Sequence, residues 1–148
     1  MRIRRAVHSD LAGIREIEDE CFGTERFPLS WFKSYLRRAG PAFLLAEDGR
    51  RPAGYAVGIV DARFRPPRAR LESIAVRKAW RKQGLGRRLL EGFEREVSRL
   101  GAASVTLEVE ETNAAARRLY VQAGYRAEGA LPDYYGHGRH GVRFVKAL

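Results

Sequence analysis

The chain has 148 residues, of which 45% are hydrophobic and 31% charged, and it contains one cysteine. This length and balance predict a single globular domain over residues 1–148. They exclude a disordered chain, an internal disulfide framework and a zinc site built from several cysteines. The 28 basic residues exceed the 18 acidic ones, and the net charge of +10 favours an anionic partner: nucleic acid, an anionic membrane or a phosphate-rich cofactor.

The hydropathy pattern predicts neither a membrane span nor a secretion signal. No stretch approaches about 18 uninterrupted apolar residues, the length that crosses a bilayer. The basic first five residues are followed by Ala6-Val7-His8-Ser9-Asp10, which lacks the apolar core of a signal peptide. We therefore expect a cytoplasmic protein, and the single cysteine is consistent with that compartment.

Two helices are predicted in the first 40 residues. Ser9 and Asp10 can cap the first one. Its apolar residues recur at helical spacing: Leu11, Ile14, Ile17 and Cys21. We assign Cys21 to this buried face rather than to a nucleophile. The second helix opens at Pro28 and ends at Gly40-Pro41.

An antiparallel hairpin is predicted next. Residues 42–46 and 53–60 form two strands, and Asp48-Gly49 between them is typical of a hairpin turn. Residues 62–69 contain two prolines and three arginines and predict a loop. Residues 70–76 form a third strand.

The rest of the chain alternates between helices and strands. A long helix runs over residues 85–100, a strand over 104–110, a short helix over 114–123, and the last strands over 125–129 and 142–147. The buried stripe of the long helix is Leu85, Leu89, Phe93, Val97 and Leu100. This order predicts an α+β fold with a mixed sheet and one parallel crossover.

The connection into the long helix has the composition of an anion site. It carries six basic residues and no acid: Arg77, Lys78, Arg81, Lys82, Arg87 and Arg88. Gly84 and Gly86 allow the backbone to approach a ligand, and the start of a helix adds partial positive charge. The segment therefore predicts a cradle for a phosphate or pyrophosphate. The alternative is a glycine turn before a helix whose basic face is solvated.

This cradle matches neither of two common nucleotide motifs. A P-loop requires Gly-x-x-x-x-Gly-Lys-Ser/Thr, which is absent. A dinucleotide fingerprint requires a third glycine after Gly84-Leu85-Gly86, and Leu89 stands in its place.

The hexapeptide Arg81–Gly86 (RKQGLG) resembles the Arg/Gln-x-x-Gly-x-Gly/Ala signature of the GNAT superfamily of N-acetyltransferases. The strand end Ile74-Ala75-Val76 resembles theirs as well. Further matches follow in order: Leu107-Glu108-Val109, Asn113-Ala114-Ala115-Ala116, Leu119-Tyr120 and Ala123-Gly124-Tyr125. The resemblance covers nearly the whole chain. It implies one domain whose mixed, mostly antiparallel sheet carries helices on both faces.

Within that superfamily the chain most resembles protein N-terminal acetyltransferases, including ribosomal-protein-alanine acetyltransferases and archaeal relatives. Phe27-Pro28-Leu29-Ser30 is similar to their Phe-Pro-Trp-Ser element, with leucine in place of tryptophan. Asp133-Tyr134-Tyr135-Gly136 is similar to their paired-tyrosine loop. The chain departs from them at Arg139-His140-Gly141, where relatives carry an acidic-Asp-Ala run, and this departure concerns the substrate rather than the acetyl donor.

The resemblance implies acetyl-CoA as cosubstrate, with no metal. Its binding residues would be Ile74, Ala75, Val76, Arg81, Lys82, Gln83, Gly84, Leu85, Gly86, Arg87, Asn113 and Tyr120. The corner would hold the pyrophosphate, and the strand end would bind the pantetheine arm. A backbone N–H near Val76 would polarise the thioester carbonyl. Asn113, or Thr112 beside it, would also cap the short helix.

The resemblance also implies a mechanism on the acceptor side. Glu108 would act as the base, directly or through a water, and Tyr120 would protonate the leaving thiolate. The α-amine of a protein or peptide N-terminus, for example that of a ribosomal protein, would attack directly in a ternary complex. Phe27, Leu29, Tyr134 and Tyr135 would bind the substrate.

Each of these assignments has an alternative. Glu108 can be a surface-facing strand residue, Tyr120 a core residue and the paired tyrosines a packed aromatic pair. Phe27 and Leu29 can be core residues. The acceptor can be a small amine or a lysine side chain, and the whole chain can be a basic RNA- or ribosome-binding protein without catalysis.

His137-x-x-His140 has the spacing of two metal ligands. It lacks a matched cysteine or acid and lies among glycines, so we expect no metal there.

Overall fold

The structure is a computed structural model that describes residues 1–38 and 40–148, and its strands form one sheet. The strands are β1 (Arg2–Arg5), β2 (Phe43–Asp48), β3 (Arg51–Asp61), β4 (Arg68–Val76), β5 (Ser104–Glu110), β6 (Arg126–Leu131) and β7 (Gly141–Ala147). The α-helices are α1 (Leu11–Phe22), α2 (Leu29–Arg38), α3 (Leu85–Arg99) and α4 (Ala114–Gln122). Short 3₁₀ turns lie at His8–Asp10, Gly23–Glu25, Gly40–Ala42 and Lys78–Trp80.

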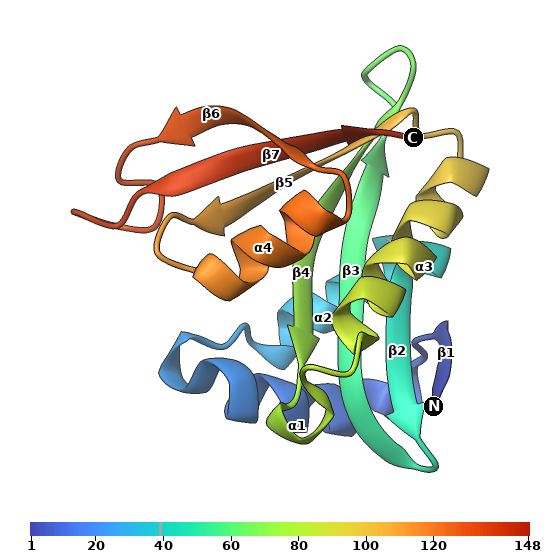
Figure 1. Cartoon of the computed structure of the whole chain (residues 1–148). Coiled ribbons are helices and arrows are strands. Elements are labelled where there is room, and N and C mark those ends of the chain that lie inside the picture. The colour runs from blue at the N-terminus through green and yellow to red at the C-terminus, as the bar shows by residue number, and fades with distance from the viewer. Residues whose placement is uncertain (39) are drawn as a thin grey trace.

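The strand order is β1-β2-β3-β4-β5-β7-β6. Neighbouring strands are antiparallel except β4 and β5, which are parallel and are connected through α3. Helices α3 and α4 cover one face of the sheet, and α1 and α2 cover the other (Figure 1). The predicted α+β fold, with its mixed, mostly antiparallel sheet and single parallel crossover, is confirmed.

Strand β3 carries the core on both of its faces. On one face the buried Tyr55 ring packs edge-on against Phe32 of α2, with 5.4 Å between ring centroids. On the other face Gly58 lies under α3, where an added Cβ would stand 2.6 Å from the Phe93 ring and would clash with the Arg70 carbonyl. Glycine is required here because the helix approaches the backbone so closely.

The two parallel strands separate soon after they pair. Arg68–Arg70 of β4 pair with Ser104–Thr106 of β5, and the remainder of each strand has no ladder to the other. Strands β5, β6 and β7 leave the plane of the other strands as an arm (Figure 1). The β3–β4 register shifts between Val57 and Gly58, which leaves Glu72 as the extra residue of a bulge at the point of separation.

A buried polar cluster fixes this arm to α3. The Tyr125 hydroxyl donates to Glu94 Oε2 at 2.8 Å, and Lys146 Nζ lies 3.0 Å from Glu94 Oε1. Glu94 is buried, and removing either partner would leave its charge incompletely satisfied. The opening between β4 and β5 is therefore held by specific contacts as well as by strand geometry.

The structure corrects several details of the sequence prediction. Residues Arg2–Arg5 form the edge strand β1, which the sequence analysis did not predict. The predicted loop over 62–69 is shorter, because β3 continues to Asp61 and β4 begins at Arg68. Leu100, placed in the buried stripe of the long helix, is 47% exposed because the helix ends at Arg99 and the chain turns.

The predicted cap of the first helix is also different. Asp10 is the N-cap of α1, but its side chain makes no capping hydrogen bond. It accepts instead from the backbone N–H of Val7 at 2.8 Å and from the Arg4 guanidinium. Asp10 thus ties α1 to β1 rather than capping the helix. Among the described residues no helix is long and apolar enough to cross a membrane.

Candidate active site

A cavity of about 1060 Å³ lies where β4 and β5 separate. Its walls come from β4, the start of α3, β5, α4, the end of α1 and the β6–β7 loop. Most of the predicted site residues line it: Phe27, Ile74, Ala75, Val76, Arg81, Lys82, Gly84, Leu85, Gly86, Arg87, Glu108, Asn113, Tyr120 and Tyr135. Leu29, Gln83 and Tyr134 do not line it.

The corner between β4 and α3 presents unused backbone donors. Gly84 is the N-cap of α3 and has a φ of 80°, in the left-handed region that glycine adopts without strain. Within the described chain, the N–H groups of residues 83–86 make no hydrogen bond of normal geometry to a protein acceptor. Nothing lies within 4 Å of a Cβ built on Gly84. The corner is therefore an open concavity of N–H groups at a helix N-terminus, which suits a phosphate group.

The basic side chains around this corner are partly engaged already. Arg81 Nε donates to the Val76 carbonyl at 2.7 Å, and Arg87 Nε lies 2.9 Å from Glu91. The Gln83 side chain turns back and donates to the Ala79 carbonyl at 3.1 Å. An anion in the corner would thus meet the backbone of residues 83–86, together with Lys82 from the loop.

The open edge of β4 supplies a second set of backbone groups. The Arg77 N–H donates to the Ala53 carbonyl of β3 at 2.9 Å. Because backbone groups alternate in direction along a strand, Ala75 also faces β3, whereas Ile74 and Val76 face the gap beside β5. No ladder to β5 occupies that side. The N–H groups of Ile74 and Val76 are available to an extended ligand lying in the gap.

Glu108 points into the protein rather than to solvent. Its side chain is only 6% exposed and lies among charged groups. Arg70 Nη2 is 3.1 Å and Arg143 Nη2 is 3.3 Å from the same oxygen, Oε1. The other oxygen, Oε2, has no hydrogen-bond partner in the described chain. Glu108 is therefore a carboxylate held in place at one oxygen, with its second oxygen free to accept a proton.

Tyr120 lies on α4 and is buried against the arm. Its ring packs against Tyr125 and Phe144 at centroid distances of 5.9 and 6.2 Å, and its side chain borders the cavity. Burial, and to a smaller extent the nearby Tyr135, raises the pKa of Tyr120. The hydroxyl is therefore protonated at neutral pH and can act as a proton donor.

Asn113 begins the same helix. Its side-chain Oδ1 accepts from the Ala116 N–H at 3.1 Å, which confirms the helix-capping prediction. Asn113 also lines the cavity, so the same residue caps α4 and borders the space beside β4.

The aromatic residues predicted for substrate binding divide into two groups. Phe27 stacks on Trp31 of α2, with 4.3 Å between ring centroids, and lines the cavity, whereas Leu29 packs against the core. Tyr135 lines the cavity, and burial raises its pKa to about 12. Tyr134 is exposed, and its hydroxyl accepts from Arg70 at 3.0 Å.

Comparisons with known proteins agree with this geometry. The sequence model of the Acetyltransferase (GNAT) family matches residues 11–125. The chain is 42% identical over 130 residues to the ribosomal protein bS18 alanine N-acetyltransferase of Escherichia coli, covering 86% of this chain and 82% of that one. An uncharacterised N-acetyltransferase of Methanocaldococcus jannaschii is 33% identical, covering 99% of this chain and 91% of that one.

The chain belongs to the acetyltransferase (GNAT) family. A Salmonella typhimurium structure that was solved with the cofactor acetyl-CoA agrees with this membership. It superposes on this acetyltransferase with a TM-score of 0.82 at 25% identity, covering 100% of this chain and 94% of that one.

The cavity of this acetyltransferase is also lined by residues that the sequence analysis did not assign to a site. Glu72 lines the cavity from β4, and Arg70 lies between it and Glu108. Cys21 also lines the cavity, with its Sγ 3.5 Å from the Val76 carbonyl. Burial raises the pKa of the Cys21 thiol, so it is protonated at neutral pH and a poor nucleophile.

Arg139 lines the cavity and joins two acidic residues. Its guanidinium lies 2.7 Å from Glu110 at the end of β5 and 3.0 Å from Glu25 in the turn after α1. The β6–β7 loop is thereby joined to the α1–α2 connection. The sequence analysis identified Arg139-His140-Gly141 as a departure from the family pattern. It could not predict the ion pairs of Arg139, because Glu25 and Glu110 are far from it in the sequence.

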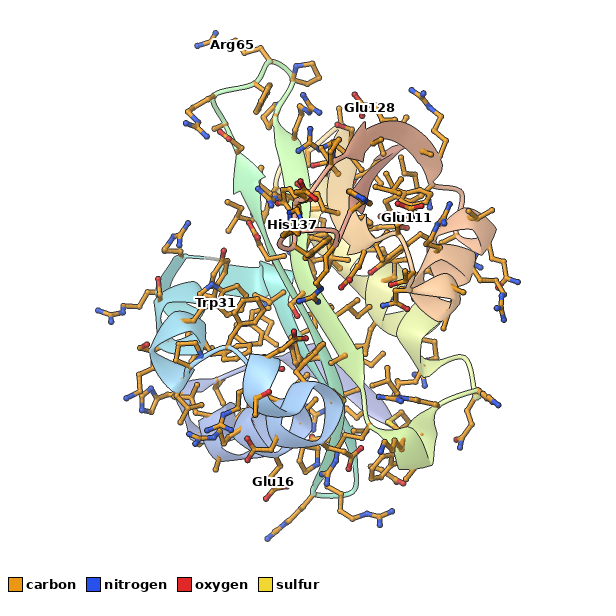
Figure 2. The ribbon with its side chains drawn as sticks, turned by 90° about the vertical axis from the view of Figure 1, so that its left-hand side faces the viewer. Glu16, Trp31, Arg65, Glu111, Glu128 and His137 are labelled. Atoms are coloured by element: carbon orange, nitrogen blue, oxygen red, sulfur yellow. The ribbon has the colours of Figure 1, made fainter. Side chains whose placement is uncertain are left out.

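The two histidines of the β6–β7 loop have different surroundings. His140 Nδ1 accepts from the Asp133 N–H at 3.0 Å. His137 is exposed on the same loop (Figure 2). No group of three or more potential metal ligands is found among the described residues.

Proposed function

We propose that this acetyltransferase transfers acetyl from acetyl-CoA to the α-amino group of protein or peptide N-termini. The observation that carries the proposal is the layout of one cavity. Unused N–H groups at a helix N-terminus form one end, the open edge of β4 runs beside the gap, and a buried glutamate with a free oxygen lies at the other end. The similarity to the Escherichia coli bS18-alanine N-acetyltransferase supports a protein N-terminus as acceptor.

The donor end fits acetyl-CoA because the unpaired donors match its phosphates. We assign the pyrophosphate to the N–H groups of residues 83–86 and the pantetheine arm to the gap-facing groups of Ile74 and Val76. When bound, acetyl-CoA supplies an activated thioester acyl group. The Val76 N–H would donate to the acyl oxygen, an interaction of a type worth roughly 2.7–4 kcal/mol of barrier lowering.

The acceptor end supplies the proton transfers. Glu108 Oε2 would accept a proton from the attacking amine, and the Tyr120 hydroxyl would give one to the leaving sulfur. Phe27 and Tyr135 would contact the first residues of the substrate, with Leu29 and Tyr134 supporting them from outside the cavity. The amine attacks directly, since the only cysteine is protonated and faces the Val76 carbonyl.

An intact-mass assay with matched peptides tests the proposal. Each peptide contains one lysine and is offered with a free or a chemically blocked N-terminus, with spermidine as a small-amine acceptor. Since an α-amine has a pKa of about 7.7–8.0 and lysine about 10.4, we expect free N-termini to react at least a hundredfold faster at pH 7. Equal rates on blocked peptides, or a preference for spermidine, would contradict N-terminal transfer while leaving acetyl transfer intact.

A further inference from the structure

Amide formation at an α-ammonium group requires two proton acceptors. At neutral pH most N-termini are protonated, because the α-amine pKa is about 7.7–8.0. Two N–H bonds break as the N–C bond forms and the C–S bond breaks; one proton ends on the thiol sulfur and the other is released. This inference rests on the proposed function, in which Glu108 removes one proton when the amine attacks and Tyr120 protonates the sulfur. The earlier deprotonation of the ammonium has no assigned residue.

Glu72 lies where such an acceptor is needed. It is the bulged residue of β4, at the point where β4 and β5 separate, and its side chain lines the cavity with 18% exposure. Bulges beside active sites commonly redirect a side chain. Arg70 Nε is 3.7 Å from Glu72 Oε2 while Arg70 Nη2 is 3.1 Å from Glu108 Oε1. One guanidinium thus lies between the two carboxylates, one from each of the separating strands.

The groups that face Glu72 come from three elements. Arg70 lies on its own strand, Glu108 on β5, and Tyr35 and Arg38 on α2. Burial raises the pKa of Glu72, and the charge of Glu108 adds to this; Arg70, the Tyr35 hydroxyl and Arg38 act in the opposite direction and do not cancel it. A carboxylate in this setting holds a proton more firmly than one in water.

The other acidic residues of the cavity are less suited to this step. Glu25 and Glu110 are both paired with Arg139, at 3.0 and 2.7 Å. The Arg139 guanidinium lowers the pKa of Glu110, which makes that carboxylate a weaker proton acceptor. Glu72 shares its arginine with Glu108 and lies at a longer distance from that arginine than Glu110 and Glu25 lie from Arg139.

We propose that Glu72 is the first proton acceptor for the substrate α-ammonium and that Glu108 is the second. In the first step one N–H bond of the ammonium breaks and its proton moves to a Glu72 carboxylate oxygen, which leaves a neutral amine. The amine attacks the thioester carbon, and Glu108 removes the second proton as the N–C bond forms. The C–S bond then breaks as Tyr120 gives its proton to the sulfur, and the proton on Glu108 is returned to Tyr120 through the cavity, which restores both groups. Glu72 returns its proton to solvent through the cavity mouth before the next cycle.

The test is the pH dependence of kcat/KM for a free N-terminal peptide. Glu72→Gln preserves shape and removes the acceptor. We expect it to lower kcat/KM about tenfold at pH 6.5 and to approach wild-type values at pH 9, where the α-amine is already neutral in solution. Glu72→Asp should recover part of the loss at low pH, and acetyl-CoA affinity should be unchanged in both variants.

Glu128→Gln is the matched control. Glu128 is also the extra residue of a strand bulge, in β6, but it is exposed and lies outside the cavity (Figure 2). We expect its pH profile to match the wild type.

Two results would overturn the inference alone: a Glu72→Gln profile that superimposes on the wild type, or a loss of the same size at every pH, which indicates a structural role. A wild-type chain that acetylates no free N-terminus would overturn the proposed function, and this inference with it.

Discussion

At the scale of single residues, the most unusual group of the core is Glu18. It lies on α1 with its side chain fully removed from solvent, and neither carboxylate oxygen has a hydrogen-bond partner of normal geometry in the described chain. Burial raises the pKa of Glu18 to about 7, and the nearby Phe27 amide and Tyr55 hydroxyl offset this only in part. Tyr55 in turn hydrogen-bonds Ser73 of β4 at 2.8 Å.

This raised pKa predicts a pH-dependent cost. Between the ordinary value of 4.5 and about 7, the unfolded chain loses the Glu18 proton while the folded chain keeps it. The free energy of unfolding therefore falls as pH rises through this window, and the loss is complete above pH 7. At about 1.4 kcal/mol for each pKa unit, the difference between 4.5 and about 7 corresponds to a cost on the order of 3 to 4 kcal/mol.

Glu18→Gln should remove that cost. We expect the variant to gain about 2 to 3 kcal/mol relative to the wild type between pH 5 and pH 8, the part of the cost that falls in this range, measured by urea unfolding at several pH values. Carboxylates whose pKa is lowered, such as Asp10, contribute equally to the pH dependence of stability in both proteins. The difference between the two stability curves therefore reports on Glu18 alone. Parallel stability curves for the two proteins would show that Glu18 is not protonated in the fold.

Sequence predicted some site residues and missed others for identifiable reasons. Residues 81–86, Glu108 and Tyr120 belong to local motifs, so the cavity-lining positions could be named before the fold was known. Glu72 could not, because its direction comes from a bulge that leaves no trace in strand alternation. Glu18 could have been noticed, since it follows Leu11 by seven residues and Ile14 by four and therefore lies on the apolar face of α1.

At the scale of elements, the helices and buried strands were predictable and the edge was not. Helix α3 has a regular apolar stripe, and β5 alternates apolar and polar residues along its length. Strand β1 has three arginines in four residues and becomes a strand only through its pairing with β2. Such pairing is a tertiary effect, and short sequence windows do not contain it.

The corner between β4 and α3 gives the prediction for this scale. Gly84→Glu places a carboxylate among the N–H groups of residues 83–86, where it would occupy and repel the phosphate site. We expect acetyl-CoA affinity, measured by calorimetry, to fall at least a hundredfold. Strain at the positive φ should cost stability of about 1 kcal/mol without unfolding the chain.

Gly101→Glu is the control for this variant. Gly101 follows the other end of α3, has a φ of 96°, and has nothing within 4 Å of a built Cβ. It therefore carries a similar backbone strain and the same new charge, but away from the cavity. If both variants bind acetyl-CoA equally well, the corner is not the phosphate site.

At the scale of the whole molecule, the basic residues behind the net charge of +10 are unevenly distributed. Around the corner between β4 and α3 the cavity is lined by Arg81, Lys82 and Arg87, whereas Glu72 of β4 and Glu108 of β5 line its strand walls. Some other cations do not line the cavity. The β3–β4 loop projects from the sheet with Arg65 at its tip (Figure 2), and the Arg68 guanidinium lies 4.5 Å from the centroid of the exposed Phe64 ring. Some of the basic residues thus lie where a cofactor in the cavity would not contact them.

This distribution predicts different salt responses for two ligands. RNA would contact the outer surface through many phosphates, so its affinity should fall at least a hundredfold between 50 and 300 mM KCl. Acetyl-CoA should lose less than about tenfold, since it meets fixed N–H groups in a cavity. Titration of both ligands at the two salt concentrations measures this, and Arg65→Glu should weaken RNA binding without changing turnover. RNA binding that resists salt, in a chain with no affinity for acetyl-CoA, would instead identify a nucleic-acid-binding protein. High salt removes the free energy gained from counterion release, so the affinity that remains must come from specific contacts.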